Sequence, residues 1–157
     1  MQNEMENNTM PNELIISENE FNALIKSQPD VRYQYALKRI ADTETMWSIV
    51  DNNGAFFIQS YGNERLFPIW SSKEYAHAFC VKDWSNWKIE AISLDTFENS
   101  IIDFICKEEL SINVFPTGQE VLGKVVGLNQ FAEDLSHALE DLSSTYKCNF
   151  LGADNKQ

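Results

Sequence analysis

The stretch MWSIVDNNGAFFIQSYGNERLFPIW, residues 46–70, decides the fold of this chain. Apolar residues alternate over residues 46–50, a pattern typical of a strand with one buried face. Asn53-Gly54 supplies the positive φ angles that a tight hairpin turn requires, so a second strand at 55–59 should pair antiparallel with the first. A second turn signal then leads into a third strand at 65–69. We therefore predict a central β-meander.

Helices are predicted on both sides of this meander. Ser17-Glu18-Asn19-Glu20 is a capping box that starts a short helix, and Pro29 suits the first turn of a second helix. On that second helix Arg32, Lys38 and Arg39 lie off the apolar face, so we expect all three on the solvated side. Three more helices are predicted from their caps and apolar stripes. Their caps are Ser71 or Ser72, Asp95 and Asn129.

Further strands are predicted at residues 88–92, 111–115 and 121–126, the last two as a hairpin. Strands and helices do not alternate strictly, so the pattern indicates an α+β fold and not a doubly wound one. We expect a mostly antiparallel sheet of about five or six strands, packed by helices from the N-terminal, middle and C-terminal segments. Residues 15–144 should form a single domain between a disordered leader at 1–14 and a C-terminal tail at 145–157.

The composition is that of one globular domain of 157 residues. The chain has 24 acidic and 12 basic side chains, a formal net charge of −12. Because phosphate backbones and anionic membranes attract Lys and Arg, we expect neither nucleic acid nor a membrane surface as a partner. The simplest interpretation of this charge is a well-solvated surface. Two more specific hypotheses are an acidic face that binds a basic partner protein, and mimicry of nucleic acid.

The cysteines form neither a metal-binding pattern nor a disulfide framework. Cys80, Cys106 and Cys148 contain no C-x-x-C pair, and only His77 and His137 could join them, so no metal and no cofactor is expected. Reduced thiols suit a cytoplasmic protein. The polar N-terminus lacks the basic start and apolar run of a signal peptide, and no apolar segment reaches the ~20 residues of a membrane-spanning helix. We predict a cytoplasmic protein.

Familiar catalytic motifs are absent from the sequence. It has no G-x-S-x-G nucleophile motif, no H-E-x-x-H and no P-loop. His77 and Cys80 could form a base and a nucleophile, but no acid is placed to orient the histidine. Asp42 with Glu44, or Glu108 with Glu109, could form acid–base pairs, although carboxylates at helix ends are usually solvated. We assign no catalytic residue and favour a protein without enzymatic activity.

Aromatic and cationic residues together suggest a ligand pocket. Two Trp residues lie in or beside the meander, and two Tyr residues lie on helices that should pack nearby. Aromatic walls with one or two cations suit an anionic or planar small ligand, or a peptide anchor. The alternative is that the rings simply form the core between helices and sheet. The candidate ligand-binding residues are Tyr33, Lys38, Arg39, Trp47, Arg65, Trp70 and Tyr75.

Two predicted helices carry rows of carboxylates. Such faces could dock a basic protein patch through an attraction that falls as salt rises, or they could simply be solvated. The candidate partner-binding residues on the first helix are Asp95, Glu98, Asp103, Glu108 and Glu109. The second helix carries Glu133, Asp134, Glu140 and Asp141.

Several motifs in a fixed order give a family resemblance. They are residues 32–42 (RYQYALKRIAD), 46–51 (MWSIVD), 67–70 (FPIW), 75–76 (YA) and 112–116 (INVFP). From about Ser17 to Leu142 the chain resembles the bacterial family DUF2750, a domain of unknown function. The resemblance implies a small cytoplasmic bacterial protein and brings no activity, cofactor or catalytic residue. Family members tend to carry Pro-His where this chain has Ser71-Ser72, so no role of that imidazole can operate here.

These observations leave three functional hypotheses. The first is a non-catalytic protein-interaction module of the adaptor or inhibitor type. The second is a small-ligand-binding protein, or an enzyme of unfamiliar type, that uses a pocket near Trp47 and Trp70. The third is a nucleic-acid mimic.

Overall fold

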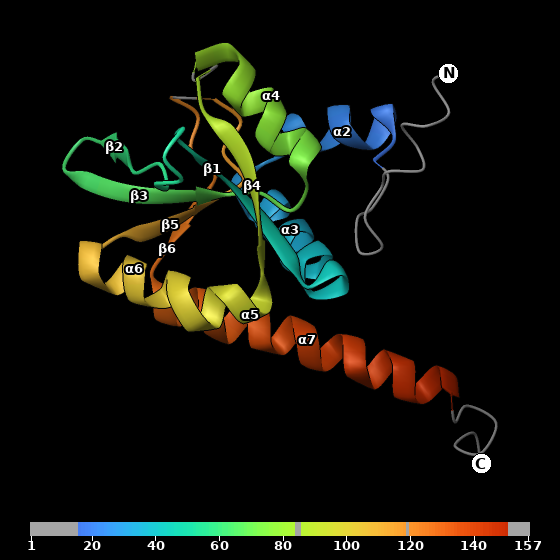
Figure 1. The fold of residues 1–157 in the computed structure, drawn as a ribbon. Coiled ribbons are helices and arrows are strands. Elements are labelled where there is room, and N and C mark those ends of the chain that lie inside the picture. Colours follow the sequence, from blue (N-terminus) through green and yellow to red (C-terminus); the bar gives the residue numbers. More distant parts are fainter. Residues whose placement is uncertain (1–15, 84–85, 119, 151–157) are drawn as a thin grey trace, which may run out of the picture.

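The structure, a computed structural model, describes residues 16–83, 86–118 and 120–150. These residues form an α+β fold in which helices surround the strands (Figure 1). The α+β class predicted from the sequence is therefore confirmed. The expected leader at residues 1–14 lies outside the described residues.

In the described part of the chain, six strands form two sheets. One sheet pairs β1 (Thr45–Val50) antiparallel with β4 (Lys88–Ser93). The other has the order β2–β3–β5–β6 and is antiparallel except between β3 and β5. Its strands are β2 (Gln59–Tyr61), β3 (Glu64–Ile69), β5 (Ser111–Val114) and β6 (Lys124–Val126). A bridge joins the two sheets, because the backbone N–H groups of Trp47 and Trp70 each donate to the other residue's carbonyl, at 2.9 and 2.8 Å.

The central meander differs from the prediction. The turn after β1 forms as expected, with Gly54 at φ 86°, but residues 55–58 touch β1 only through the Val50–Phe56 bridge and one Phe57–Ile49 hydrogen bond. These residues form no regular strand, and their rings pack on other segments, Phe56 on Phe67 and Phe57 on Trp87. β4, which comes much later in the chain, pairs with all of β1 instead.

The first three helices begin where the local signals predicted, whereas the next two begin one or more residues earlier than their predicted caps. In α2 (Glu18–Ile25) the Ser17 side chain accepts from the Glu20 N–H at 3.1 Å, and Pro29 starts α3 (Pro29–Thr43). α4 (Lys73–Asp83) follows β3. α5 (Leu94–Thr96), the π-helical turn η1 (Phe97–Ile101) and α6 (Ile102–Glu108) follow one another directly. Ser93, and not Asp95, caps α5 through the Thr96 N–H, and the last helix begins at Leu128, before Asn129.

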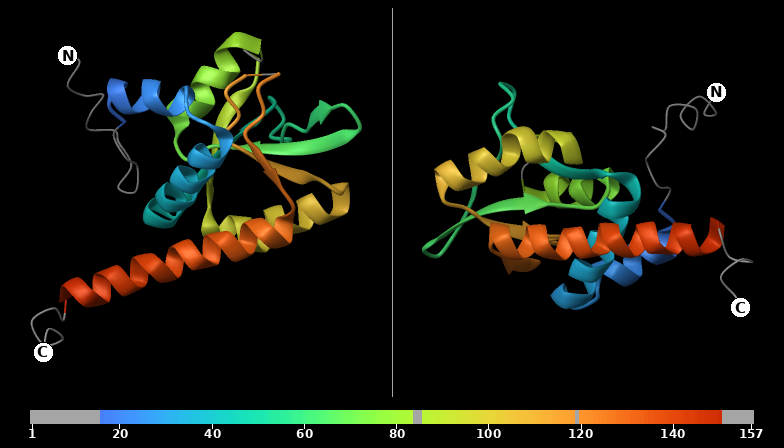
Figure 2. Two further views of the ribbon diagram at one scale, coloured as in Figure 1. Left: turned by 180° about the vertical axis from the view of Figure 1, so that it is seen from behind. Right: turned by 90° about the horizontal axis from the view of Figure 1, so that it is seen from below.

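The last helix, α7 (Leu128–Phe150), is the longest. It runs past α3 and the α5–η1–α6 segment, and its C-terminal part extends beyond the sheets (Figure 2). Residues 145–150 of the expected tail continue this helix, and the rest of the tail lies outside the described residues. No helix in the described ranges combines the length and apolar character needed to cross a bilayer.

Arg32 is an exception to the prediction that the cations of α3 face solvent. Its side chain is only 2% exposed. Nε donates to the Phe115 carbonyl at 3.0 Å, Nη2 to the Leu122 carbonyl at 3.3 Å, and Nη1 to the Ser27 carbonyl. Burial lowers the pKa of Arg32, yet a guanidinium stays charged at ordinary pH. The prediction was wrong because it considered one helix alone and not the loop carbonyls around it.

Gly123 lies where two segments approach closely. Its N–H donates to the Asn113 side chain at 2.8 Å, and the Asn113 amide donates to Gln59 at 2.9 Å, all in the buried interior. A Cβ atom added at Gly123 would lie 1.9 Å from the Val114 carbonyl oxygen. Only glycine fits this position without displacing the backbone.

Replacing Arg32 with Met should lower the free energy of unfolding by about 3 kcal/mol, because Met fills the volume but leaves three carbonyls without their donor. Chemical denaturation measures this loss. Lys38→Met is the matched control, since Lys38 lies exposed on the same helix, and it should change the value by less than about 0.5 kcal/mol. Equal losses for the two variants would contradict a structural role for the Arg32 guanidinium.

The Gly123→Ala variant should lose about 3 kcal/mol of unfolding free energy, because its methyl group forces β5 and the turn before β6 apart. Gly118→Ala is the comparison, since its added Cβ would meet only the Val121 side chain at 3.5 Å. That variant should stay within about 1 kcal/mol of the parent protein. Thermal unfolding followed by circular dichroism distinguishes the two, and similar melting temperatures would count against the close approach.

Candidate functional site

Two open grooves lie on different sides of α7. The first, the η1–α7 groove, has a volume of about 500 Å³ and lies between the start of the α5–η1–α6 segment and α7. The second, the α3–α7 groove, has a volume of about 460 Å³ and lies between α3 and α7. Both volumes are within the range of about 300–1,000 Å³ that is usual for ligand sites.

The pairing of β1 with β4 brings together the acidic residues of the η1–α7 groove. Thr45 lies opposite Ser93, and the Leu94 N–H donates to the Glu44 carbonyl at 3.1 Å. Glu44, the C-cap of α3 with φ 56°, therefore lies next to the turns that carry Asp95 and Glu98. The three carboxylates come from three local structures: a helix cap, α5 and η1.

Besides these carboxylates, the η1–α7 groove is lined mainly by apolar side chains, together with the hydroxyl residues Thr45, Ser93 and Ser136. Leu94 and Ile102 contribute from one side, and Leu135 and Leu139 from α7. These side chains are buried or half-buried, whereas Glu44, Asp95 and Glu98 are exposed, so the carboxylates form a rim above an apolar floor. No Lys or Arg lines this groove. Within the described residues none of the three carboxylates makes an ion pair.

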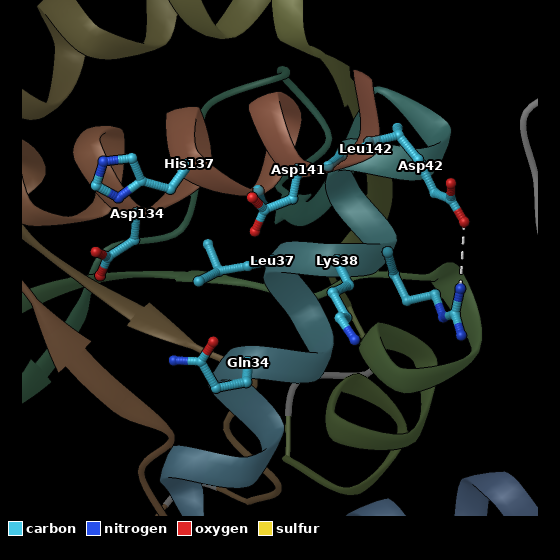
Figure 3. A pocket seen from close by; sticks show the side chains of 11 residues that line it. Gln34, Leu37, Lys38, Asp42, Asp134, His137, Asp141 and Leu142 are labelled. Carbon is cyan, nitrogen blue, oxygen red and sulfur yellow. Dashed lines mark hydrogen bonds and ion pairs between the residues drawn. The ribbon is translucent and has the colours of Figure 1, made fainter. Parts of the chain in front are cut away.

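The polar groups of the α3–α7 groove are partly paired. The Tyr33 hydroxyl donates to Asp134 at 2.6 Å across the two helices, and the Gln130 amide donates to the other Asp134 oxygen at 3.0 Å. Arg39 pairs with Asp42 at 3.3 Å and lies over the Tyr35 ring at 5.2 Å. Four other polar residues, Gln34, Lys38, His137 and Asp141, also line the groove, around Leu37 (Figure 3).

The structure separates the predicted ligand-binding residues. Lys38 and Arg39 line the α3–α7 groove, and Tyr33 contacts it through Asp134. Trp70 is completely buried and donates from Nε1 to the Pro116 carbonyl at 2.9 Å, and Trp47 is 8% exposed. Neither Trp lines either groove.

The other two predicted ligand-binding residues lie elsewhere. Tyr75 stacks on Phe21 at 5.3 Å and contacts Phe115 at 4.4 Å between ring centres. Arg65 lies on β3, and its guanidinium donates to the backbone carbonyl of Glu108 at 2.6 Å and to the Glu108 carboxylate at 3.1 Å. These seven residues therefore do not line one common pocket.

Only part of the predicted partner-binding row lines a groove. Asp95 and Glu98 belong to the rim of the η1–α7 groove. Asp103 and Glu109 are exposed outside both grooves. Glu108 is neutralised by Arg65. The η1–α7 groove therefore contains the first two residues of the predicted row and none of the last three.

The catalytic alternatives have unsuitable surroundings. Cys80 is 5% exposed, and its Sγ donates to the Trp87 carbonyl at 3.5 Å. Burial raises the pKa of the Cys80 thiol, which disfavours the reactive thiolate. Asp42 is engaged by Arg39 and Glu108 by Arg65. Among the described residues no three His, Cys, Asp or Glu side chains are placed to hold a metal ion.

Sequence reasoning missed several groove residues. Glu44 was considered only as half of an acid–base pair, because its position beside Asp95 depends on the unpredicted pairing of β1 with β4. Leu135 and Leu139 belong to the apolar stripe from which the last helix is predicted, but the stripe alone does not show that part of it stays open. The spacing of Asp134, His137 and Asp141 on α7 could have indicated a polar stripe beside that face.

The fold and the two grooves define a small α+β protein with two open grooves along its last helix. The chain belongs to the family described as a protein of unknown function, DUF2750, whose model matches residues 33–135. The match covers more than half of the chain and ends at Leu135, within α7. A comparison with curated proteins gives no match.

The buried residues Tyr33 and Tyr75 and the half-buried Tyr35 couple the stability of the fold to alkaline pH. Burial, followed by the hydrogen bond to Asp134, raises the pKa of Tyr33. Burial, followed by the neighbouring Tyr35 hydroxyl, raises the pKa of Tyr75, and burial and Glu20 raise that of Tyr35. Each raised pKa means that the folded state favours the protonated phenol. The stabilisation is complete below the unfolded-state pKa of about 10 and is lost as the pH rises above it.

We therefore expect the free energy of unfolding to fall above about pH 10, by up to about 1.4 kcal/mol per pH unit for each buried tyrosine. Tyr33→Phe should remove one such contribution and make the decline less steep. Tyr61→Phe, at an exposed residue of β2, is the control and should leave the profile unchanged. Denaturant titrations between neutral and alkaline pH test this, and identical slopes for Tyr33→Phe and the parent protein would contradict it.

Proposed function

We propose that this protein is a non-catalytic interaction module that binds a basic segment of a partner protein in the η1–α7 groove. The observation that carries the proposal is the rim of three unpaired carboxylates, Glu44, Asp95 and Glu98, above an apolar floor. Carboxylates close together without a cation repel one another, and a Lys or Arg from a partner would relieve that repulsion. The net charge of −12 would attract such a partner over a longer range.

The proposed occupant is an amphipathic helix. The floor offers apolar side chains from two neighbouring helical elements, and this arrangement suits a helix whose anchors are spaced i, i+3, i+4 and i+7. Lys or Arg residues beside those anchors would lie over the acidic rim. The apolar contacts would supply most of the affinity, while the charges would supply orientation and partner choice.

We place this activity in the bacterial cytoplasm, as an adaptor or inhibitor. Cys80 and Cys106 are free thiols, as expected in a reducing compartment. A second candidate function, small-ligand binding, is favoured by the α3–α7 groove. Trp47 and Trp70 do not support it, because they lie in the core.

A synthetic helical peptide with Leu anchors and flanking Lys residues tests the proposal by fluorescence anisotropy at low and moderate salt. The protein should bind it, and binding should weaken as salt rises. A peptide with the same Leu anchors and Glu in place of Lys should bind at least about tenfold more weakly. Equal binding of the two peptides would overturn the proposal.

Matched charge variants distinguish the effect of the groove carboxylates on peptide binding from the effect of the protein's net charge. Asp95→Asn with Glu98→Gln should weaken binding of the Lys peptide about tenfold. Asp103→Asn with Glu109→Gln removes two charges from the same part of the chain but outside the groove, and should weaken binding less than about twofold. Equal effects of the two double variants would show that only the net charge matters.

A further inference from the structure

We propose that the α3–α7 groove is a separate site for a zwitterionic molecule of the amino-acid or short-peptide class. In this site Lys38 binds the ligand's carboxylate and Asp141 binds its ammonium group. Some polar groups of the groove already have partners, and the others are available to a ligand. This site is independent of the protein-binding role of the η1–α7 groove, because the two grooves share no lining residue.

Two of the acidic residues in this groove already have partners. Asp134 accepts a hydrogen bond on each oxygen, from Tyr33 at 2.6 Å and from Gln130 at 3.0 Å. Asp42 pairs with Arg39 at 3.3 Å. The Tyr33–Asp134 hydrogen bond joins α3 to α7, and Arg39 is held on α3 by Asp42 and the Tyr35 ring.

The remaining polar residues are available for a ligand. Gln34 and Lys38 are one helical turn apart on α3, and His137 and Asp141 are one turn apart on α7, so each pair projects from one helix face. Within the described residues none of these four makes a hydrogen bond or an ion pair. Figure 3 shows the two pairs on the two helices, and all four residues line the same groove.

The separation of the two free charges selects the ligand class. Lys38 and Asp141 line the same groove but form no ion pair, so the groove keeps opposite charges apart. An anion bound at Lys38 would be repelled by Asp134 and Asp141, and a cation bound at Asp141 would be repelled by Lys38 and Arg39. A zwitterion satisfies both ends at once.

The neutral parts of the groove suit the rest of such a molecule. Leu37, Ala41, Ala138 and Leu142 provide an apolar surface for an aliphatic side chain. Gln34 and His137 can donate to and accept from a peptide group. A groove of about 460 Å³ has room for more than one amino-acid residue. We therefore take the dipeptide Ala-Leu as the probe.

The test is a titration of the full chain with Ala-Leu, followed by amide chemical shifts in ¹H–¹⁵N NMR spectra. We expect binding in the millimolar range, with shifts in residues 34–42 and 134–142. N-acetyl-Ala-Leu, which lacks the ammonium group, and Ala-Leu amide, which lacks the carboxylate, should each bind about fivefold more weakly. Equal binding of the three probes, shifts elsewhere, or no binding at millimolar concentration would each overturn the proposal.

Variants assign each charge to its residue. Lys38→Gln should weaken binding of Ala-Leu about fivefold but should not weaken binding of Ala-Leu amide, because that probe has no carboxylate and Lys38 only repels its ammonium group. Asp141→Asn should likewise weaken binding of Ala-Leu but not of N-acetyl-Ala-Leu, whose carboxylate Asp141 repels. The controls, Lys107→Gln and Glu140→Gln, make the same charge changes at exposed residues outside the groove, and should leave all three affinities unchanged. Effects of the control variants as large as those of the groove variants would exclude the assigned contacts.

Discussion

The buried guanidinium of Arg32 is the contact on which the rest of the structure depends. It donates to carbonyls of three separate segments: the turn between α2 and α3, the end of β5 and the turn before β6. Those bonds fix α3 against β5 and β6, and β6 leads through Gly127 directly into α7, whose Phe131 N–H donates to the Gly127 carbonyl at 3.0 Å. Because α7 lines both grooves, the geometry of each groove depends on a residue that touches neither.

An arginine is required at this position for a geometric reason. The planar guanidinium directs several donors along different fixed directions, whereas a lysine ammonium is one compact group on a flexible chain. Arg32 also stabilises a strained neighbour: Phe115 adopts φ 65°, which costs a bulky residue about 1–3 kcal/mol. Its carbonyl accepts from Arg32, and its ring packs on Tyr75 and lies beneath the guanidinium. The left-handed turn persists because contacts on both the carbonyl and the ring require it.

Much of the local structure could be predicted from the sequence, and most of the long-range structure could not. The Ser17 cap, the start of α3 at Pro29 and the β5–β6 hairpin depend on neighbouring residues and were identified correctly. The pairing of β1 with β4 and the parallel pairing of β3 with β5 depend on which segments meet in the folded core. The candidate sites follow the same division. Asp95 and Glu98 could be identified from one predicted helix. Glu44 lies beside them only because β1 pairs with β4. The carbonyls around Arg32 come from loops that are far apart in the sequence.

The apolar stripe of α7 shows how one helix can serve two different surfaces. Leu135 and Leu139 face the acidic groove, while Ala138 and Leu142 face α3, so a pattern that resembles one core face is divided between two partly open sides. The net charge of −12 attracts basic groups to both sides alike and cannot distinguish them. The pairing of individual carboxylates does distinguish the two sides. Beside α3, Asp42 pairs with Arg39 and Asp134 accepts from Tyr33. In the η1–α7 groove, Glu44, Asp95 and Glu98 have no such partners within the described residues. Specificity along α7 is therefore set by which carboxylates already have partners and not by how many there are.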